Sequence, residues 1–401
     1  MTNKTTIAVF FGGKSVEHEI SVLSAMQAIA AFDENKYKII PIYLTKEGTW
    51  HTGDALLEVD NYKNTKQLLA QCEEVYITPS AKDQGIYKVK TSWFGKAEIG
   101  TFDVAFPILH GSPGEDGSLQ GLFELKQIPY VGSDVLSSAV SMDKIMSKMV
   151  LKESGVSVVD YTWFYEADWF EREEEILVEA KETLGYPIIV KPANLGSSVG
   201  ISKADNEEEL REAIELATSF APRILLEKVI TNLTEINCSV MGNNGNIMLS
   251  ACEEPLRSGE ILSYDDKYMS GGGGKGAKGG GGSSGKGMSG LKRKLPAELP
   301  EQVQKDINRM AYDTFRVLDN GGVVRIDFLW DKDTNEVFVN EINSIPGSLS
   351  FYLWEATDKS FSKLLDEMIS FALKRQRDRS GLVKTYDRNI FQMSGGKTGK
   401  S

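Results

Sequence analysis

The chain has 401 residues, of which 41% are hydrophobic and 25% are charged, so it is long enough for two or three compact domains. Its 45 basic and 57 acidic residues give a net charge of -12, which excludes general binding to DNA or RNA, because an acidic surface gains nothing from counterion release at a phosphate backbone. Three cysteines without metal-binding spacing indicate a reducing compartment. The apolar run at residues 7–11 is too short for a signal peptide or a membrane span, so we expect a cytoplasmic protein with no membrane partner.

The first third of the chain alternates between strand and helix patterns. The apolar run at residues 7–11 ends in two glycines and is followed by helical spacing of apolar residues, which predicts a strand, a glycine turn and a helix. Residues 37–45 and 102–111 predict further strands, and residues 119–128 predict a helix. This alternation indicates an α/β layer domain over residues 1–143 with a mostly parallel sheet.

The remainder of the chain predicts two further domains and a tail. Residues 144–232 carry a helix after the SMDK motif, two strands joined by the loop NLGSSVG, another helix and the strand RILLEKV. Residues 233–378 carry paired strands, a glycine-rich stretch at 264–290, a helix, two more strands and a last helix whose apolar residues share one face. The polar, basic residues 379–401 are expected to form a mobile tail.

The strand patterns VVRIDFLW and VFVNEIN carry polar side chains at every second position. Alternation directs Arg325 and Asp327 to one face of the first strand, and Glu341 and Asn343 to one face of the second. If these strands pair, two carboxylates, a carboxamide and a guanidinium share one face of a sheet. Hard oxygen ligands of this kind suit Mg²⁺, which keeps its other positions for water and phosphate oxygens. A solvated polar face with a surface ion pair is the alternative.

The segment PIIVKPANLGSSVGISK combines a lysine at the end of a buried strand with a loop of glycines and serines. Lys191, Ser197, Ser198 and the backbone N–H groups of the loop would surround one point, which predicts a phosphate site, and an ordinary hairpin turn is the alternative. Lys144 in SMDK is a candidate contact for a nucleotide phosphate. Glu227 in LLEKV is a candidate contact for an adenine amino group or a ribose.

The segment ILHGSPGEDGSLQG places a histidine, glycines and two carboxylates directly before a helix. Several backbone donors therefore meet near a helix N-terminus, where an anion can bind. Glu115 or Asp116 acting only as a helix cap is the alternative. His110 is either a general base or a buried structural histidine.

Four motifs, HGSPGEDGSLQG, VKPANLGSSVG, RIDF and NEINSIPGS, closely resemble in order and separation those of the D-alanine-D-alanine ligase family of ATP-grasp enzymes. The resemblance extends from Gly12 to about Leu373. It implies an α/β (α+β) protein in which an N-terminal α/β layer domain is followed by a two-lobed ATP-grasp fold, with residues 144–232 and 233–378 as the two lobes. It also implies a homodimeric ligase that joins two D-alanine molecules at the expense of ATP, through an acyl phosphate, for peptidoglycan synthesis.

The resemblance further assigns roles to individual residues. The implied ligands of two Mg²⁺ ions, or of Mn²⁺, are Asp327, Glu341 and Asn343. The implied contacts of ATP are Lys144, Lys191, Ser197, Ser198, Glu227, Glu235 and Lys267. The implied contacts of the two D-alanine substrates are Glu17, His110, Glu115, Ser348 and Tyr352. The implied catalytic residues are Glu17, Ser197, Tyr268, Arg325 and Gly347.

Within the implied catalytic set, Arg325 and the backbone N–H of Gly347 would stabilise the tetrahedral intermediate. Glu17 would hold the amino group of the first D-alanine, and with Ser197 and Tyr268 it would form a hydrogen-bonded link across the closed site. The glycine-rich stretch at 264–290 would then be a lid over ATP that has Lys267 and Tyr268 at its entrance.

Two features depart from the family pattern and leave the acceptor open. Tyr352 stands where a serine would bind the carboxylate of the second substrate, and the glycine-rich stretch is unusually long. D-alanine is our leading interpretation of the acceptor and D-serine is the alternative, while Tyr268 favours an amine over a hydroxy acid. A catalytically silent nucleotide-binding homologue is a more remote alternative, and a Rossmann-type redox enzyme is disfavoured because GxGxxG is absent.

Overall fold

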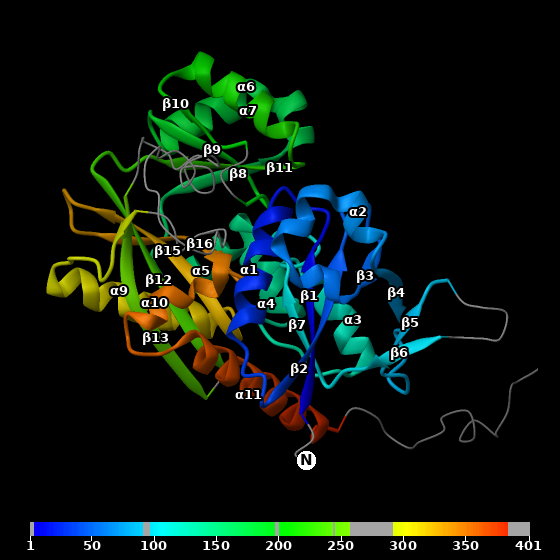
Figure 1. The fold of residues 1–401 in the computed structure, drawn as a ribbon. Coiled ribbons are helices and arrows are strands. Elements are labelled where there is room, and N and C mark those ends of the chain that lie inside the picture. Colours follow the sequence, from blue (N-terminus) through cyan, green and yellow to red (C-terminus); the bar gives the residue numbers. More distant parts are fainter. Residues whose placement is uncertain (1–3, 91–96, 197–199, 244, 257–291, 384–401) are drawn as a thin grey trace, which may run out of the picture.

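The computed structural model describes residues 4–90, 97–196, 200–243, 245–256 and 292–383, and arranges them around three β-sheets (Figure 1). The first sheet has seven strands in the order β6-β5-β4-β3-β2-β1-β7. Their bounds are β1 (Thr5–Gly12), β2 (Tyr37–Leu44), β3 (Trp50–Thr52), β4 (Glu73–Ile77), β5 (Gly85–Lys88), β6 (Glu98–Thr101) and β7 (Val104–Ile108).

This first sheet is mixed, so the expectation of a mostly parallel sheet is wrong. β1 pairs in parallel with β2 and β7, whereas the pairs from β2 to β6 are antiparallel. Strands β2 to β6 are neighbours both in the sequence and in the sheet, which is the arrangement of hairpins and meanders rather than of parallel crossovers.

The predicted strand, glycine turn and helix at the start of the chain are confirmed. Residues 7–11 of β1 have no exposed surface, as expected for a central strand covered on both faces. β1 ends at Gly12, whose φ of +91° is favourable only for glycine, and a Cβ there would lie 2.3 Å from the carbonyl oxygen of Leu44. The helices of this part are α1 (His18–Ala31), η1 (Asp54–Leu57), η2 (Val59–Asn64), α2 (Thr65–Leu69), α3 (Ser118–Lys126) and α4 (Val135–Met142).

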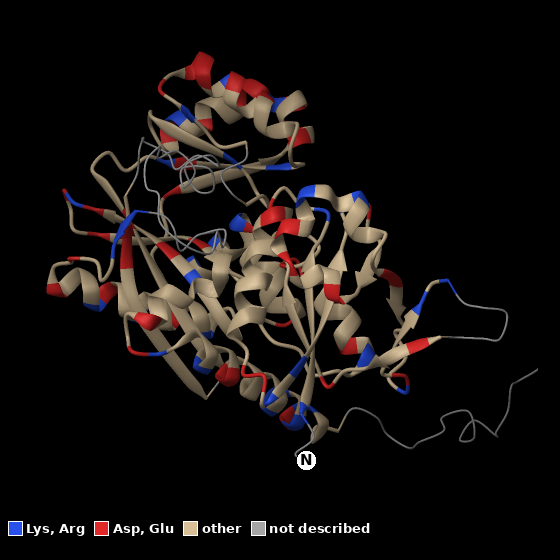
Figure 2. Cartoon of the chain, in the orientation of Figure 1, with Lys and Arg blue, Asp and Glu red and all other residues tan. Residues whose placement is uncertain are grey.

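The second sheet has four antiparallel strands in the order β10-β9-β11-β8. Its strands are β8 (Tyr161–Tyr165), β9 (Ile188–Pro192), β10 (Ser202–Ala204) and β11 (Arg223–Lys228). Helices α6 (Glu166–Thr183) and α7 (Glu207–Thr218) pack against it and share one apolar cluster with it (Figure 1). The outer surface of these two helices is strongly acidic (Figure 2), so part of the net negative charge lies away from the sheets.

The third sheet has five strands in the order β14-β13-β12-β15-β16. Its strands are β12 (Leu233–Asn243), β13 (Asn246–Pro255), β14 (Arg293–Lys294), β15 (Gly322–Asp331) and β16 (Val337–Asn343). The remaining helices of the described residues are α5 (Lys144–Glu153), α9 (Glu301–Val317), η4 (Gly347–Ser350), α10 (Phe351–Glu355) and α11 (Phe361–Ser380). Each sheet lies within one predicted domain, and the domain boundaries themselves stay predictions.

The last helix, α11, connects the first and third sheets. Its residues Phe361, Leu364, Leu365 and Met368 are buried in one apolar cluster with residues of β1, β7, β12 and β15, which confirms that they share a packing face. Figure 1 shows α11 running alongside both sheets. No helix within the described ranges combines the length and the hydropathy needed to cross a membrane.

We predict that Leu365→Ala lowers the free energy of unfolding by about 2–5 kcal/mol, because it leaves a cavity where a fully buried side chain joins two sheets. Urea denaturation followed by circular dichroism measures the change. Lys363→Ala, at an exposed position on the same helix, is the matched control and should change stability little. Equal stability of the two variants would contradict the packing role of α11.

Candidate active site on the five-stranded sheet

A row of polar side chains crosses the third sheet. The register of β13, β12 and β15 places Glu253, Asn237 and Asp327 side by side. Asp327 in turn lies opposite Glu341 of β16. The residues that alternate with this row belong to the apolar cluster beneath α9. The predicted pairing of the last two strands, with their polar residues on one face, is therefore confirmed.

The centre of the row is a buried ion pair. Arg325 Nε donates to Asp327 Oδ1 at 2.6 Å, and Arg325 Nη2 donates to Asp327 Oδ2 at 2.7 Å. Asn343 Nδ2 donates to the same Oδ2 at 3.1 Å. Burial alone would lower the pKa of Arg325, but the attraction of Asp327 outweighs it and raises this pKa well above its usual value. The guanidinium is therefore a fixed positive charge on this face.

The oxygen donors on this face fit a hard divalent cation. Asp327, Glu341 and the amide oxygen of Asn343 would supply two carboxylates and a carboxamide, and would leave the other positions to water and phosphate. The guanidinium of Arg325 would share Asp327 with such an ion. In the part of the chain that the structure describes, no group of three or more His, Cys, Asp or Glu side chains is placed to hold a metal.

Two lysines border the row. The register between β15 and β16 shifts by one residue beside Glu341, and the extra residue is Asn340. Asn340 Oδ1 accepts a hydrogen bond of 3.0 Å from Lys191 Nζ on β9. Lys144 Nζ on α5 donates to the carbonyl of Leu195 at 2.5 Å and lies 3.8 Å from Glu341 Oε2. The second and third sheets therefore meet at a point where ammonium groups face carboxylates.

Glu227, which the sequence suggested as a nucleotide contact, is buried between two lysines. Its Oε2 lies 2.6 Å from Lys191 Nζ, and its Oε1 lies 2.9 Å from Lys148 Nζ. Burial alone would raise the pKa of Glu227, but Lys148 and Lys191 outweigh it and lower that pKa to about 2. Sequence reasoning missed Lys148; its spacing of four from Lys144, on one helix face, was the available signal.

His110 is held at both ring nitrogens. Its Nδ1 lies 2.7 Å from the carbonyl oxygen of Ile345, and its Nε2 lies 3.0 Å from Ser24 Oγ. Since a carbonyl only accepts, Nδ1 carries the proton and Nε2 accepts from the Ser24 hydroxyl. Ser24 Oγ also accepts the backbone N–H of Ser348 at 2.8 Å. Burial lowers the pKa of His110, so these contacts favour a neutral structural histidine over a general base.

Glu115 ties two loops together rather than capping a helix. Its Oε2 accepts the backbone N–H of Gly111 at 2.8 Å, and its Oε1 accepts the N–H of Ile345 at 2.9 Å. Asp116 is the residue that accepts the N–H of Ser118 at the start of α3. Burial, and then the nearby charge of Glu17, raise the pKa of Glu115 to about 7.

Glu17 lies where the first and second sheets approach each other. A Cβ built on Gly196, in the loop after β9, would be only 2.8 Å from Glu17 Oε2, so a larger residue there would displace the Glu17 carboxylate. Glu17 also influences the titration of both His110 and Glu115. The three predicted first-substrate residues are therefore close together.

The loop that follows β16 has an unusual backbone. Gly347 begins the turn η4, and Ser348, Leu349 and Ser350 follow with φ of 54°, 49° and 49°. The left-handed region is costly for residues with a side chain, so the surrounding contacts must hold this turn. The N–H of Ser348 is one such contact, through its hydrogen bond to Ser24.

Tyr352, the residue that departs from the family pattern, lies in an ion-pair cluster. Its hydroxyl donates to Glu253 Oε1 at 3.1 Å, and Asn237 Nδ2 donates to the same oxygen at 3.0 Å. Arg293 Nη1 lies 2.7 Å from Glu253 Oε2, and its guanidinium carbon lies 3.9 Å from the centre of the Tyr352 ring. Burial, followed by the charge of Glu253, raises the pKa of Tyr352. The phenol is therefore protonated, and it lies near enough to Arg325 for each group to influence the pKa of the other.

Of the other predicted residues, the structure describes only some. Glu235 lies on β12, on the same face as Asn237 and half-buried. The predicted residues Ser197, Ser198, Lys267 and Tyr268, with the glycine-rich stretch at 264–290, lie outside the described residues.

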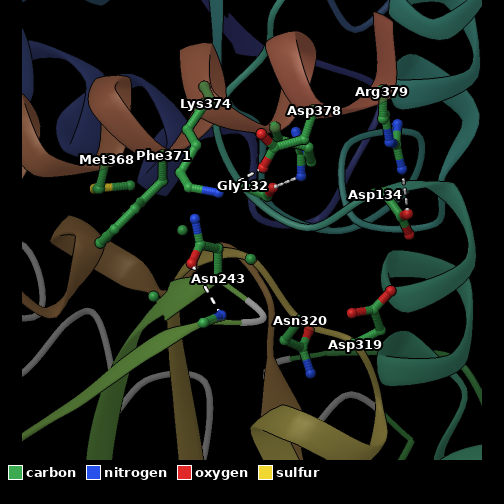
Figure 3. Close-up of a pocket in the computed structure, with 16 residues that line it drawn as sticks. Gly132, Asp134, Asn243, Asp319, Asn320, Met368, Phe371, Lys374, Asp378 and Arg379 are labelled. Atoms are coloured by element: carbon green, nitrogen blue, oxygen red, sulfur yellow. Dashed lines mark hydrogen bonds and ion pairs between the residues drawn. The ribbon is translucent and has the colours of Figure 1, made fainter. Parts of the chain in front are cut away.

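A separate cavity of about 230 Å³ lies between α11, the β12–β13 turn and the start of β15 (Figure 3). Lys374 pairs with Asp378 and Arg379 pairs with Asp134, so these charges are offset within the cavity wall. None of the described residues that line it belongs to the predicted site.

Comparison with known proteins places this geometry in a family. A model described as D-ala D-ala ligase N-terminus matches residues 6–133, and one described as D-ala D-ala ligase C-terminus matches residues 150–370. The chain belongs to the D-alanine-D-alanine ligase family. The expected fold of the family, an N-terminal α/β domain followed by a two-lobed ATP-grasp fold, is thereby confirmed.

Similar proteins of this family match along almost their whole length. D-alanine--D-alanine ligase of Thermosipho melanesiensis is 38% identical, with 98% of this chain and 99% of that protein covered. The ligase of Thermosipho africanus is 40% identical, with 96% and 98% covered. Among solved structures, VanG D-Ala:D-Ser ligase from Enterococcus faecalis is 30% identical with a TM-score of 0.76, and 92% of this chain and 100% of that chain are covered. The D-alanine-D-alanine ligase from Coxiella burnetii is 29% identical with a TM-score of 0.76, and 98% and 99% are covered.

We predict that Glu115 makes the stability of this ligase-family protein fall between pH 4.5 and pH 7. The folded pKa of about 7 exceeds the ordinary value of 4.5, so the folded state binds the proton more tightly than the unfolded state does. Below pH 4.5, Glu115 is protonated in both states and does not reduce the free energy of unfolding. One pKa unit corresponds to about 1.4 kcal/mol, so above pH 7 the ionisation of Glu115 reduces the free energy of unfolding by about 3 kcal/mol.

Urea denaturation of the wild type and of Glu115→Gln at several pH values isolates this effect, because glutamine cannot ionise. The variant loses hydrogen bonds and is less stable overall, but its stability should fall less over this interval. Parallel pH dependence of the two proteins would contradict the raised pKa.

Proposed function

We propose that this chain is an ATP-dependent D-alanine-D-alanine ligase that forms D-alanyl-D-alanine for peptidoglycan. The observation that carries the proposal is the polar face of the third sheet, where Arg325, Asp327 and Glu341 border Lys144 and Lys191. Both halves of the chain match the ligase family, and its full-length relatives are named D-alanine--D-alanine ligase.

The reaction needs an activated carboxylate, because a free carboxylate is a poor electrophile. An oxygen of the first D-alanine attacks the terminal phosphorus of ATP, and ADP leaves. The amine of the second D-alanine then attacks the acyl carbon, loses a proton, and inorganic phosphate leaves. When bound, Mg²⁺ or Mn²⁺ held by Asp327, Glu341 and Asn343 would offset the charge of the phosphate oxygens.

The residues of the chain would orient the substrates and stabilise charge. Lys144 and Lys191 would hold phosphate groups. The guanidinium of Arg325 and the N–H of Gly347 would face the developing oxyanion, where a fixed dipole or charge is most effective. Glu17 would bind the ammonium group of the first D-alanine.

Further assignments rest on the family resemblance. They comprise the link of Glu17 with Ser197 and Tyr268, a lid at residues 264–290, and the contacts with ATP of Ser197, Ser198, Glu227, Glu235 and Lys267. Glu115, His110 and Ser348 would shape the pocket of the amino-acid substrates. A homodimer in the cytoplasm completes the proposal.

D-serine is the second candidate for the acceptor. A D-Ala:D-Ser ligase is among the structural neighbours, and Tyr352 replaces the serine expected beside the acceptor carboxylate. The phenol and the adjoining Arg293 alter the shape and charge of that side of the site.

We predict that D-alanine alone stimulates phosphate release from Mg·ATP and yields D-alanyl-D-alanine, because both substrate positions would accept it. Phosphate assay and mass spectrometry of the products measure this, with L-alanine as the control. An excess of D-alanyl-D-serine in a mixture of equal D-alanine and D-serine would move the acceptor to D-serine. Absence of phosphate release with either amino acid would exclude the ligase activity.

We predict that Glu341→Gln lowers kcat/KM by about 100-fold or more, since even changes behind a metal ligand cost 10- to 100-fold. Steady-state kinetics measure the loss, and unchanged circular dichroism shows that the fold is intact. Glu336→Gln, at an exposed position before β16, is the matched control. Asp327→Asn should also inactivate, but it weakens the pairing of buried Arg325. A Glu341→Gln variant with wild-type kinetics would remove the metal assignment.

A further inference from the structure

Lys148 is a buried lysine that has no direct role in the proposed reaction. It lies on α5 one turn after Lys144, and its side chain is 1% exposed. Its Nζ forms an ion pair with Glu227 Oε1 at 2.9 Å. Burial lowers the pKa of Lys148, and the charge of Glu227 opposes this change, so Glu227 is the group that stabilises the ammonium form there.

Among the described residues, Lys191 has two polar partners, whereas Lys148 has one. Its Nζ lies 2.6 Å from Glu227 Oε2 and donates to Asn340 Oδ1 at 3.0 Å. Its side chain is 10% exposed, against 1% for Lys148. Lys191 thus lies at the boundary between the second and third sheets, whereas Lys148 lies behind Glu227.

This difference affects how Lys191 can bind a phosphate. If Lys191 were the sole counter-ion of Glu227, moving its ammonium group toward a nucleotide would leave a buried carboxylate unpaired. That cost would oppose nucleotide binding. Because Lys148 contacts Glu227 Oε1, Glu227 keeps a counter-ion even when the ammonium group of Lys191 moves toward a nucleotide.

We infer that Lys148 is a positioning residue, a permanent counter-ion of Glu227 that releases Lys191 to bind a nucleotide phosphate. The inference rests on the proposed function, because it takes Lys191 to be a phosphate ligand. Lys148 itself touches neither nucleotide nor metal in this account.

Calorimetric titration of the full chain with Mg·ADP tests the inference without catalysis. We expect Lys148→Met to raise the Kd for Mg·ADP about tenfold, since Glu227 then retains Lys191. Lys148→Arg preserves the charge and should bind within about twofold of the wild type. Lys152→Met, at an exposed position one turn further along α5, is the matched control and should leave the Kd unchanged.

A double-mutant cycle separates this role from a merely structural one. In a Glu227→Gln background no carboxylate competes for Lys191, so Lys148→Met should change the Kd by less than about twofold. Thermal melting checks that each variant folds. Lys148→Gln, which is polar but uncharged, replaces Lys148→Met in the cycle if the latter does not fold.

Two results overturn the inference. A Lys148→Met protein that binds Mg·ADP as tightly as the wild type excludes it, and so does an equal effect of Lys148→Met in both backgrounds. Either result leaves the ligase assignment intact provided that the wild type binds Mg·ADP. A wild-type protein without Mg·ADP binding would instead overturn the ATP-dependent function together with the inference.

Discussion

The register between β15 and β16 is the constraint on which the rest of the site depends. It sets Asp327 opposite Glu341 and Arg325 opposite Asn343. Because side chains alternate between the faces of a strand, a slip of one residue would turn all of these groups into the apolar layer beneath α9. The same register contains the single-residue shift that brings Asn340 to Lys191. Strand pairing therefore determines both the position of the carboxylates and the contact with the second sheet.

The first sheet contributes residues to the candidate site from its loops rather than from its strands. The loop after β7 carries His110 and Glu115, and both bind the backbone of Ile345 in the loop after β16. These bonds connect segments more than two hundred residues apart in the sequence. Beneath them, the cluster on α11 holds the first and third sheets together. Apolar packing thus holds the two sheets together, and the buried hydrogen bonds fix the relative position of the loops after β7 and β16.

The parts of the site that the sequence predicted are those whose geometry is local. Alternation along a strand is enough to put Arg325 and Asp327 on one face, and the pairing of β15 with β16 followed from two neighbouring segments. The antiparallel half of the first sheet was missed, since strand direction depends on which neighbour a strand meets. Lys148 was missed for a similar reason: its spacing from Lys144 shows a shared helix face, but not that this face is buried against Glu227. Likewise, the proton position on His110 depends on a carbonyl from a distant loop.

The close approach of Gly196 to Glu17 has a mechanical consequence. A Cβ at position 196 would come within 2.8 Å of Glu17 Oε2. Since this oxygen is the far end of a flexible side chain, the carboxylate would have to turn away to make room. A methyl group at this position would therefore displace the carboxylate that is proposed to bind the first substrate, without altering a charge.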